Sequence, residues 1–479
     1  MLATRTFSLA DQRLFARASG DFNPMHMDPL AARRTPAGAP VVHGMHVFLW
    51  ALESLLQACR PPTRLAAMKA TFKSFVYLDR PVELELVTRD ERHMKARVHA
   101  DGMPVVNLTL QLGGMTESAH EVAQAAPELR LPSTPEDHDF ESTAGLSGWL
   151  ALGDAPAELA HALPNAIVSI GSQRVAALAR LSAIVGMVCP GLHSIFSEFS
   201  LKLMHDEPAR RAIGFRTLHA DERFRLVTMA IGGAGFAGEA RCFVRRAPVA
   251  PPEANAFASL VLHDEFAKTV ALIVGGSRGL GAVTANLIAA GGGKVVITYA
   301  NGREDALGLQ RDIEAEHGAG TCRAIALDVQ REVAPQLRGA TLPEIDQLYY
   351  FATPHIYRPH AALVDPSLFE EFVRYYVFGF CETVRAIGAH SAGRPLAILY
   401  PSSVFVERAP KHLTEYAMAK SAGEQLCKAL ALAEPRLHVV CERLPAMRTD
   451  QTAGVLPVED AQPAPIMLRL IRSMRKPTP

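Results

Sequence analysis

The stretch TVALIVGGSRGLGAVTANLIAAGGG, residues 269–293, decides the fold of the C-terminal half of the chain. A short, continuously apolar run leads into a glycine-rich turn, and an apolar helix candidate follows. Five more apolar runs come after it, separated by helical stretches, at 294–300, 322–329, 345–353, 395–403 and 437–445. Apolar strands that alternate with helices indicate a parallel sheet covered on both faces. The sequence therefore predicts a doubly wound α/β domain here.

The glycine-rich turn, GGSRGLG (275–281), has the composition of a nucleotide-binding loop. Glycines let the backbone turn tightly and approach a pyrophosphate that rests on a helix N-terminus. Such a turn alone is a weak sign, but here a strand precedes it and a helix follows. We expect the loop to hold a dinucleotide through Gly275, Ser277, Arg278, Gly279, Leu280 and Gly281.

Charge near this loop bears on which dinucleotide is bound. A carboxylate at the end of the second strand would bind the ribose 2′-OH of NAD, but Tyr299 and Ala300 stand there. Together with the cation Arg278 this favours NADP(H) over NAD(H), unless Arg278 is only a solvated loop residue. Asp328, at the end of the third strand, is expected to accept from the adenine amino group. A carboxylate whose role is only to cap the end of the strand would give the same sequence pattern.

A second motif, YPSSVFVERAPKHLTEYAMAK (400–420), ends a strand in two serines and places Tyr416 four residues before Lys420. Residues i and i+4 share one face of a helix, so the ammonium is expected to lower the pKa of the phenol. Such a tyrosine can give a proton to a carbonyl oxygen that Ser403 orients.

The segment from about 268 to 450 resembles the short-chain dehydrogenase/reductase family, whose fold is Rossmann-like. GGSRGLG, LDV (327–329), the serine–tyrosine–lysine motif and RLPAMRT (443–449) carry the resemblance. It implies that Ser403, Tyr416 and Lys420 are catalytic and that Thr449 contacts the nicotinamide carboxamide.

The segment departs from that family in three ways. FATP (351–354) replaces the usual Asn-Asn-Ala-Gly, and Tyr376 stands where an asparagine often completes a proton relay. The usual closing strand is missing, and a basic helix candidate, PIMLRLIRSMRK (465–476), ends the chain. These departures put the relay and the dimerisation mode in doubt more than cofactor binding.

The N-terminal half contains two similar segments. Each has a long apolar helix candidate, 41–59 or 169–189, followed by strand candidates, 68–112 or 192–244. The offset from Gly44 to Gly171 equals that from Phe72 to Phe199, namely 127 positions. The pattern predicts an internal repeat in which a sheet wraps a central helix in each copy, although two unrelated α+β segments could agree by chance.

The first copy carries the motif SGDFNPMHMD (19–28), followed by VVHGM (41–45) at the start of the long helix. Asn-Pro forces a turn that can bring the carboxylate of Asp21 and the imidazole of His26 together over one water molecule. Adding water to an enoyl thioester needs such an acid/base pair, and backbone donors for the thioester oxygen. The helix N-terminus at Gly44 can supply one of these donors.

This motif resembles the MaoC-like or (R)-specific enoyl-CoA hydratase family, whose fold is the hotdog. The resemblance implies that Asp21 and His26 are catalytic, that Gly44 lies on the oxyanion side, and that Asn23 and His43 hold the turn. The second copy resembles a hotdog that has lost the motif, because Gly171-Ser172 stands near the position of His43-Gly44. The expected fold is therefore an α+β double hotdog followed by an α/β Rossmann-like domain.

Composition excludes several classes of protein. The chain has 479 residues, with 49 Lys+Arg against 49 Asp+Glu, so it lacks the basic surplus of a nucleic-acid binder. Its seven cysteines form no CxxC pair, which suggests reduced thiols and no metal site. No signal peptide and no membrane span are recognised, and a cytoplasmic location is expected.

Two polar or proline-rich stretches, 117–142 and 245–257, suggest linkers. The expected domains are 1–116, 143–244 and 258–479. Together, the two resemblances predict a bifunctional enzyme that reduces 3-oxoacyl thioesters with NADPH and dehydrates the (R)-3-hydroxyacyl product, in fatty-acid or polyketide-type chain building. Its partner would be an acyl-CoA or an acyl carrier protein thioester, and a homo-oligomer is possible. A hydratase with a degenerate reductase domain and an oxidative enzyme of β-oxidation stay open as alternatives.

Overall fold

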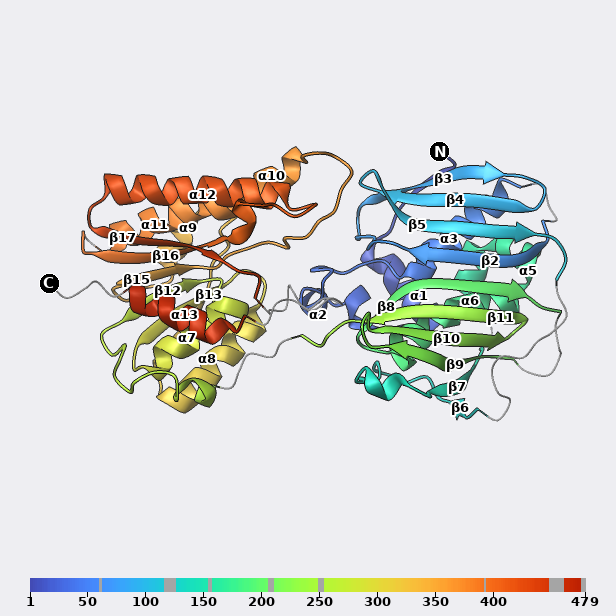
Figure 1. Ribbon diagram of the computed structural model, residues 1–479, viewed down its shortest axis with the longest axis horizontal. Coiled ribbons are helices and arrows are strands. Elements are labelled where there is room, and N and C mark those ends of the chain that lie inside the picture. Colours follow the sequence, from blue (N-terminus) through green and yellow to red (C-terminus); the bar gives the residue numbers. More distant parts are fainter. Residues whose placement is uncertain are drawn as a thin grey trace. The chain divides into compact units, whose positions relative to one another are not determined.

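The computed structural model describes residues 1–59, 63–115, 126–153, 157–205, 211–248, 254–391, 393–447 and 461–474. These residues form two compact units, one within 1–247 and one within 248–479 (Figure 1). Within the described ranges, no helix combines the length and the apolar character that a membrane span requires.

The first unit is built on one sheet, to which the described residues contribute eleven strands. Across the sheet their order is β1-β3-β4-β5-β2-β8-β11-β10-β9-β7-β6. In chain order they are β1 (Ala3–Thr6), β2 (Leu65–Phe72), β3 (Pro81–Arg89), β4 (His93–Ala100), β5 (Met103–Leu112), β6 (Glu128–Leu129), β7 (Ser147–Ala151), β8 (Ser194–Leu203), β9 (Ala212–Asp221), β10 (Leu226–Gly233) and β11 (Phe236–Val244).

The strand order shows the predicted repeat directly. The order β1-β3-β4-β5-β2 is followed by β8-β11-β10-β9-β7, which is the same arrangement read in the opposite direction. The two halves meet where β2 pairs antiparallel with β8, and in this register Thr71 lies opposite Glu198. Their numbers differ by 127, the offset found in the sequence, so each residue of the pair is the other's counterpart in the repeat.

One long helix from each half packs on the same side of this sheet, and the two helices contact each other (Figure 1). They are α3 (Gly44–Gln57) and α6 (Ser172–Ala183), and α6 continues into a π-helical turn at Ile184–Val188. Their apolar residues join those of both half-sheets in one buried cluster. The other helices of the unit are α1 (Leu9–Ser19), α2 (Pro29–Ala32), α4 (Ala157–Ala162) and α5 (Pro164–Ile170).

The stretch predicted as a first linker is only partly a spacer. Residues 116–125 lie outside the described residues, but from residue 126 onward the chain is bound to the second half. Strand β6 pairs with β7, and Glu136 exchanges backbone hydrogen bonds with Met187 and Leu192. In the described part of this predicted linker, these contacts satisfy backbone groups that composition alone assigns to solvent.

The second unit has the predicted doubly wound parallel sheet. Its six described strands lie in the order β14-β13-β12-β15-β16-β17, and all neighbours are parallel. They are β12 (Val270–Val274), β13 (Lys294–Tyr299), β14 (Cys322–Ala326), β15 (Gln347–Tyr350), β16 (Leu396–Ser403) and β17 (Leu437–Leu444). The order reverses between β12 and β15, and the carboxyl ends of strands at such a point form a ligand crevice in doubly wound sheets.

Helices cover both faces of this sheet (Figure 1). They are α7 (Gly279–Ala290), α8 (Arg303–His317), α9 (Val333–Gly339), α10 (Pro366–Val373), α11 (Gly379–His390), α12 (Thr414–Ala433) and α13 (Pro463–Ser473). The basic C-terminal helix candidate forms α13, which packs against α7. Its arginines Arg469 and Arg472 form ion pairs with Glu442 and Glu265.

The seam between β2 and β8 can be tested by removing a core ring. Phe199 is fully buried opposite Ala70, and its ring meets Phe48 at 4.8 Å between centroids. Phe199→Ala should lower the free energy of unfolding by about 3–5 kcal/mol. Both tryptophans, Trp50 and Trp149, lie in the first unit, so tryptophan fluorescence during urea denaturation reports on that unit. Lys202→Ala, at an exposed position on the same strand, should lower the free energy of unfolding by less than about 0.5 kcal/mol. Equal effects of the two variants would contradict a buried core at the pairing of β2 with β8.

Candidate functional site

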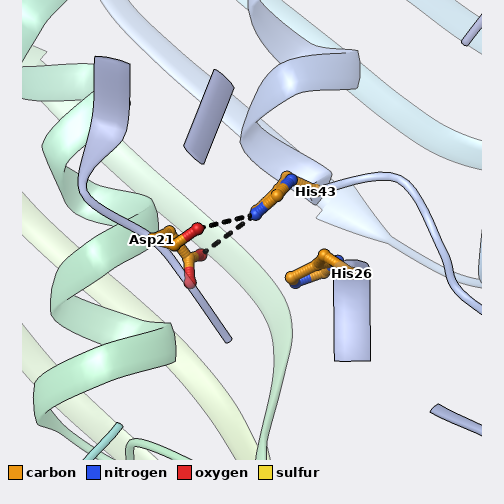
Figure 2. Close-up of side chains that lie close together, drawn as sticks. All are labelled: Asp21, His26 and His43. Atoms are coloured by element: carbon orange, nitrogen blue, oxygen red, sulfur yellow. Dashed lines mark hydrogen bonds and ion pairs between the residues drawn. The ribbon is translucent and has the colours of Figure 1, made fainter. Parts of the chain in front are cut away.

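The loop after α1 brings together the side chains that the first motif predicted. Gly20, with a φ of +80°, ends α1, and Asn23 caps the 3₁₀ turn Pro24–His26 by accepting from the amide of Met25 at 3.1 Å. This double turn folds His26 back toward Asp21. His43 approaches from the residue just before α3, and ligand atoms of the three side chains lie within 4.8 Å of one another (Figure 2).

The carboxylate of Asp21 is buried but has two hydrogen-bond donors. The hydroxyl of Ser182, on α6, donates to Oδ2 at 2.6 Å, and the amide of Asn23 donates to Oδ1 at 3.1 Å. Burial raises the pKa of Asp21, and His26, Ser182 and Asn23 oppose that rise. Asp21 can therefore serve as a proton donor as well as an anion.

His26 has a defined tautomer. Its Nδ1 lies 2.8 Å from the carbonyl oxygen of Val41, which can only accept, so Nδ1 carries the proton and Nε2 has a free lone pair. Burial lowers the pKa of His26, and the carboxylate of Asp21 opposes the effect. A neutral imidazole with Nε2 unprotonated is the state that a general base requires.

His43 is fully buried and fixed by Gln12. Both its backbone amide and its Nδ1 face Oε1 of Gln12, at 3.1 and 2.9 Å. Its ring stacks on that of His26 with centroids 3.8 Å apart. On its other side, Nε2 lies 3.1 Å from the backbone oxygen of Asp21. These contacts hold the two turns together.

The second half, which lacks the motif, forms one wall of this site. The side-chain amide of Asn23 donates to the carbonyl of Gly186 at 2.9 Å, and a Cβ at Gly186 would lie 2.4 Å from Oδ1 of Asp21. Sequence reasoning missed Ser182, Gly186 and Gln12. The one signal was a glycine inside an apolar helix, IVGMV (184–188), which often marks a close approach.

Gly44 opens α3 beside this loop. The amides of the first helical turn have no partner within the helix, so they can bind an oxygen that gains negative charge. A Cβ at Gly44 would lie 3.1 Å from the ring of Phe72. In the second half, Gly171 caps α6 with a φ of +87°.

The glycine-rich loop of the second unit fits a dinucleotide. Gly275 and Gly279 have φ values of +76° and +54°, and a Cβ on Gly281 would lie 2.4 Å from the carbonyl oxygen of Gly275. Two hydrogen bonds to Thr298, at the end of β13, fix the loop. The amide of Gly275 donates to Oγ1 at 3.1 Å, and the amide of Gly276 donates to the backbone oxygen at 3.0 Å. Ser277 and Arg278 lie in this loop, and Leu280 lies in the first turn of α7.

Two further predicted cofactor residues are less well placed. Asp328 accepts from the amide of Gln330 at 2.9 Å and pairs with Arg331 at 3.5 Å, so it caps its own strand end. Both roles considered for Asp328 therefore stay open. Thr449 lies outside the described residues.

Ser403, Tyr416 and Lys420 come together where β16 ends against α12. Ser403 accepts from the amide of Phe405 at 3.2 Å and interacts with the Tyr416 hydroxyl. Lys420 is buried, and its Nζ donates to the carbonyl of Pro401 at 2.7 Å. The ring of Tyr376 lies 4.1 Å from that ammonium, and its hydroxyl bonds Thr353 at 2.5 Å.

The expected effect of Lys420 on the tyrosine was wrong. Burial raises the pKa of Tyr416, and only the hydrogen bond with Ser403 opposes that rise. Burial also lowers the pKa of Lys420 to about 7. The ammonium lies 6.0 Å from the centre of the Tyr416 ring and is bonded to Pro401, so desolvation outweighs the attraction that helical spacing suggested.

Comparisons with known families match two parts of the chain. Residues 2–105 match the family model of the MaoC like domain, and residues 269–456 match that of the short chain dehydrogenase. The chain carries a MaoC-like domain and a short-chain dehydrogenase domain. A short-chain dehydrogenase domain implies a nicotinamide cofactor, and the glycine-rich loop has the shape to hold one.

Two curated relatives match part of the chain. The peroxisomal multifunctional enzyme type 2 of Mus musculus is 31% identical over 100 residues, which are 20% of this chain and 14% of that protein. The (R)-specific enoyl-CoA hydratase of Aeromonas caviae is 45% identical over 42 residues, which are 9% of this chain and 31% of that protein. The chain therefore spans less than a third of either relative.

Solved structures of dehydrogenases also resemble part of the chain. A short-chain dehydrogenase from Shigella flexneri is 21% identical, with 45% of this chain and 88% of that chain covered and a TM-score of 0.40. Sorbitol-6-phosphate 2-dehydrogenase from Erwinia amylovora is 25% identical, with 36% and 70% covered and a TM-score of 0.34.

A glycine substitution tests the dinucleotide loop. Gly281→Ala should weaken NADPH binding at least tenfold, because the new Cβ would overlap the carbonyl of Gly275. Gly308→Ala is the matched control, since its Cβ would lie 3.9 Å from the nearest neighbour, on α8. Titration of NADPH fluorescence gives both affinities, and unchanged binding by Gly281→Ala would place the cofactor elsewhere.

Proposed function

We propose that the MaoC-like unit adds water to trans-2-enoyl thioesters and removes it from (R)-3-hydroxyacyl thioesters. The observation that supports this most is the pairing of a buried carboxylate, Asp21, with a neutral imidazole, His26, whose Nε2 is free. In hydration, Nε2 of His26 accepts a proton as the water oxygen bonds C3, and protonated Asp21 gives its proton to C2. A proton then passes from His26 to Asp21 and restores both groups. The double bond is consumed, and the amide of Gly44 stabilises the enolate oxygen.

We also propose that this unit is a double hotdog with one active half. The mirrored strand order and the two central helices support the assignment. The proposed domains are 1–116, 143–244 and 258–479. On this view the second copy keeps its fold because Ser182 on α6 and Gly186 in the π-helical turn after it complete the site of the first copy.

For the second unit we propose reduction of a 3-oxoacyl thioester. The hydroxyl of Tyr416 would donate a proton to the 3-oxo oxygen, and Ser403 would orient that oxygen. Lys420 lies one turn further along α12, with its ammonium 6.0 Å from the centre of the Tyr416 ring, and would supply the proton that restores the phenol. The bound nicotinamide supplies the hydride. We propose NADPH as the donor, because Arg278 lies in the loop and the end of β13 has no acidic residue.

The two reactions share an intermediate. Reduction gives a 3-hydroxyacyl thioester, and dehydration of that product gives the enoyl thioester. Joining both sites in one chain raises the concentration of the intermediate at the second site. The NADPH preference favours the reductive direction and hence acyl chain building, on coenzyme A or a carrier protein.

A second candidate is a hydratase whose reductase-like unit only binds nucleotide. One observation favours it: Tyr376 occupies the relay position, and its ring covers the ammonium of Lys420 at 4.1 Å. An oxidative enzyme of β-oxidation is the other alternative, and only the cofactor preference speaks against it.

Paired substitutions separate the two chemistries. Asp21→Asn should lower crotonyl-CoA hydration at least 100-fold and leave NADPH-dependent reduction of acetoacetyl-CoA intact, because it removes the acid of the first site only. Tyr416→Phe should do the reverse. Spectrophotometric assays of both reactions measure the effects, and loss of both activities in either variant would argue against independent sites.

The role of the second half can be tested at Gly186. Gly186→Ala should lower hydration at least tenfold, because its Cβ would overlap the carboxylate of Asp21. Gly153→Ala is the control, since a Cβ there would have no neighbour within 4 Å. If both variants hydrate crotonyl-CoA like the wild type, the second half does not shape the site.

A further inference from the structure

A second imidazole, that of His43, lies beside the hydratase pair and faces oxygen acceptors with both of its ring nitrogens. The backbone N–H of His43 can only donate, so the atom of Gln12 that it faces at 3.1 Å must be the oxygen. That oxygen also faces Nδ1 of His43 at 2.9 Å, and the backbone oxygen of Asp21 faces Nε2 at 3.1 Å, so a neutral His43 donates to only one of the two and turns a lone pair toward the other. His26 keeps its proton on Nδ1 because of Val41, and the His43 tautomer with its proton on Nδ1 would add a second unprotonated Nε2 beside that of His26.

The surroundings of the His43 Nε2 are acceptors. It faces the backbone oxygen of Asp21 at 3.1 Å and the carboxylate Oδ2 of Asp21 at 4.0 Å. Oδ2 already accepts from the hydroxyl of Ser182. Acceptors gathered in this way favour a cation.

We propose that Asp21, His26 and His43 bind a divalent transition-metal ion of the zinc class, and that the bound ion switches off hydration. The binding stands on the arrangement of these three side chains alone. The inhibition rests on the proposed hydratase function, because the ion would occupy the carboxylate and the His26 lone pair that hydration uses.

The donor set matches this class of ion. Two imidazole nitrogens and one carboxylate suit zinc, cobalt or nickel, whereas magnesium and calcium prefer oxygen ligands. Zinc–nitrogen bonds of ~2.0–2.1 Å place tetrahedral ligands roughly 3.3 Å apart. The three ligand atoms here lie within 4.8 Å, so small rotations of the side chains complete the site, with water as a fourth ligand.

The outer contacts also resemble those of a metal site. Imidazole ligands of metals usually donate their other N–H to an oxygen, which fixes the ring. Val41 accepts from His26, Gln12 would accept from His43 in the Nδ1-protonated tautomer, and Ser182 and Asn23 hold the carboxylate. The site is therefore organised before an ion arrives.

Cobalt(II) tests the binding without any enzyme assay. Titration of the full chain with Co²⁺ should give the intense visible absorption of a four- or five-coordinate ion, saturate at one equivalent, and be lost on adding Zn²⁺. His43→Gln should weaken this binding at least tenfold, and Asp21→Asn gives an independent second variant. His99 lies on β4, away from the three ligands, and is paired with Glu85, so His99→Gln should bind Co²⁺ like the wild type.

Hydration of crotonyl-CoA is then measured with and without Zn²⁺. Inhibition that EDTA reverses, with NADPH binding unchanged, is the expected result. A metal-free enzyme that hydrates crotonyl-CoA but gives no one-equivalent Co²⁺ spectrum, or gives the same spectrum in His43→Gln, would overturn the metal site alone. A metal-free enzyme that does not hydrate crotonyl-CoA would instead contradict the proposed function, and the cobalt spectrum would still decide the binding.

Discussion

The antiparallel pairing of β2 with β8 is the interaction on which the first unit depends. It joins two copies of one arrangement into a single sheet and places α3 and α6 side by side on it. As a result, the π-helical turn after α6 lies against the loop that carries Asp21. Ser182 then donates to the carboxylate, and Gly186 leaves room for it. The site of the first copy thus depends on the second, even though the second lacks the Asp–His motif.

The two sites use burial in different ways. In the MaoC-like domain, burial raises the pKa of Asp21 and lowers that of His26, so the two groups become more similar in proton affinity. That is the condition for moving a proton between two partners and one water molecule. In the short-chain dehydrogenase domain, burial raises the pKa of Tyr416 and lowers that of Lys420 to about 7. The acid there stays protonated until substrate arrives, and aromatic rings surround the ammonium.

Much of the fold and of the first site could be predicted from local patterns in the sequence. Each apolar run of the second unit became a parallel strand, because a strand covered on both faces has no polar positions to obscure it. The motif around Asp21 and His26 also predicted its own turn, since Asn23 and Pro24 act within a few residues. Contacts between distant segments were not predictable: Ser182 lies 161 positions from Asp21, and no periodicity links the two. The pKa of Tyr416 was predicted in the wrong direction, because helical spacing describes neighbours but not burial.

The proposed function requires one chain to reduce a 3-oxoacyl thioester and to dehydrate the product. The most direct measurement supplies acetoacetyl-CoA to the wild-type chain with NADPH, or with NADH in a parallel reaction, and follows both nucleotide oxidation and the thioester products. If both sites act as proposed, NADPH should be oxidised faster than NADH, and crotonyl-CoA should appear in equilibrium with the 3-hydroxybutyryl thioester without any added enzyme. Binding of NADPH with no oxidation, while added crotonyl-CoA is still hydrated, would contradict the proposed function.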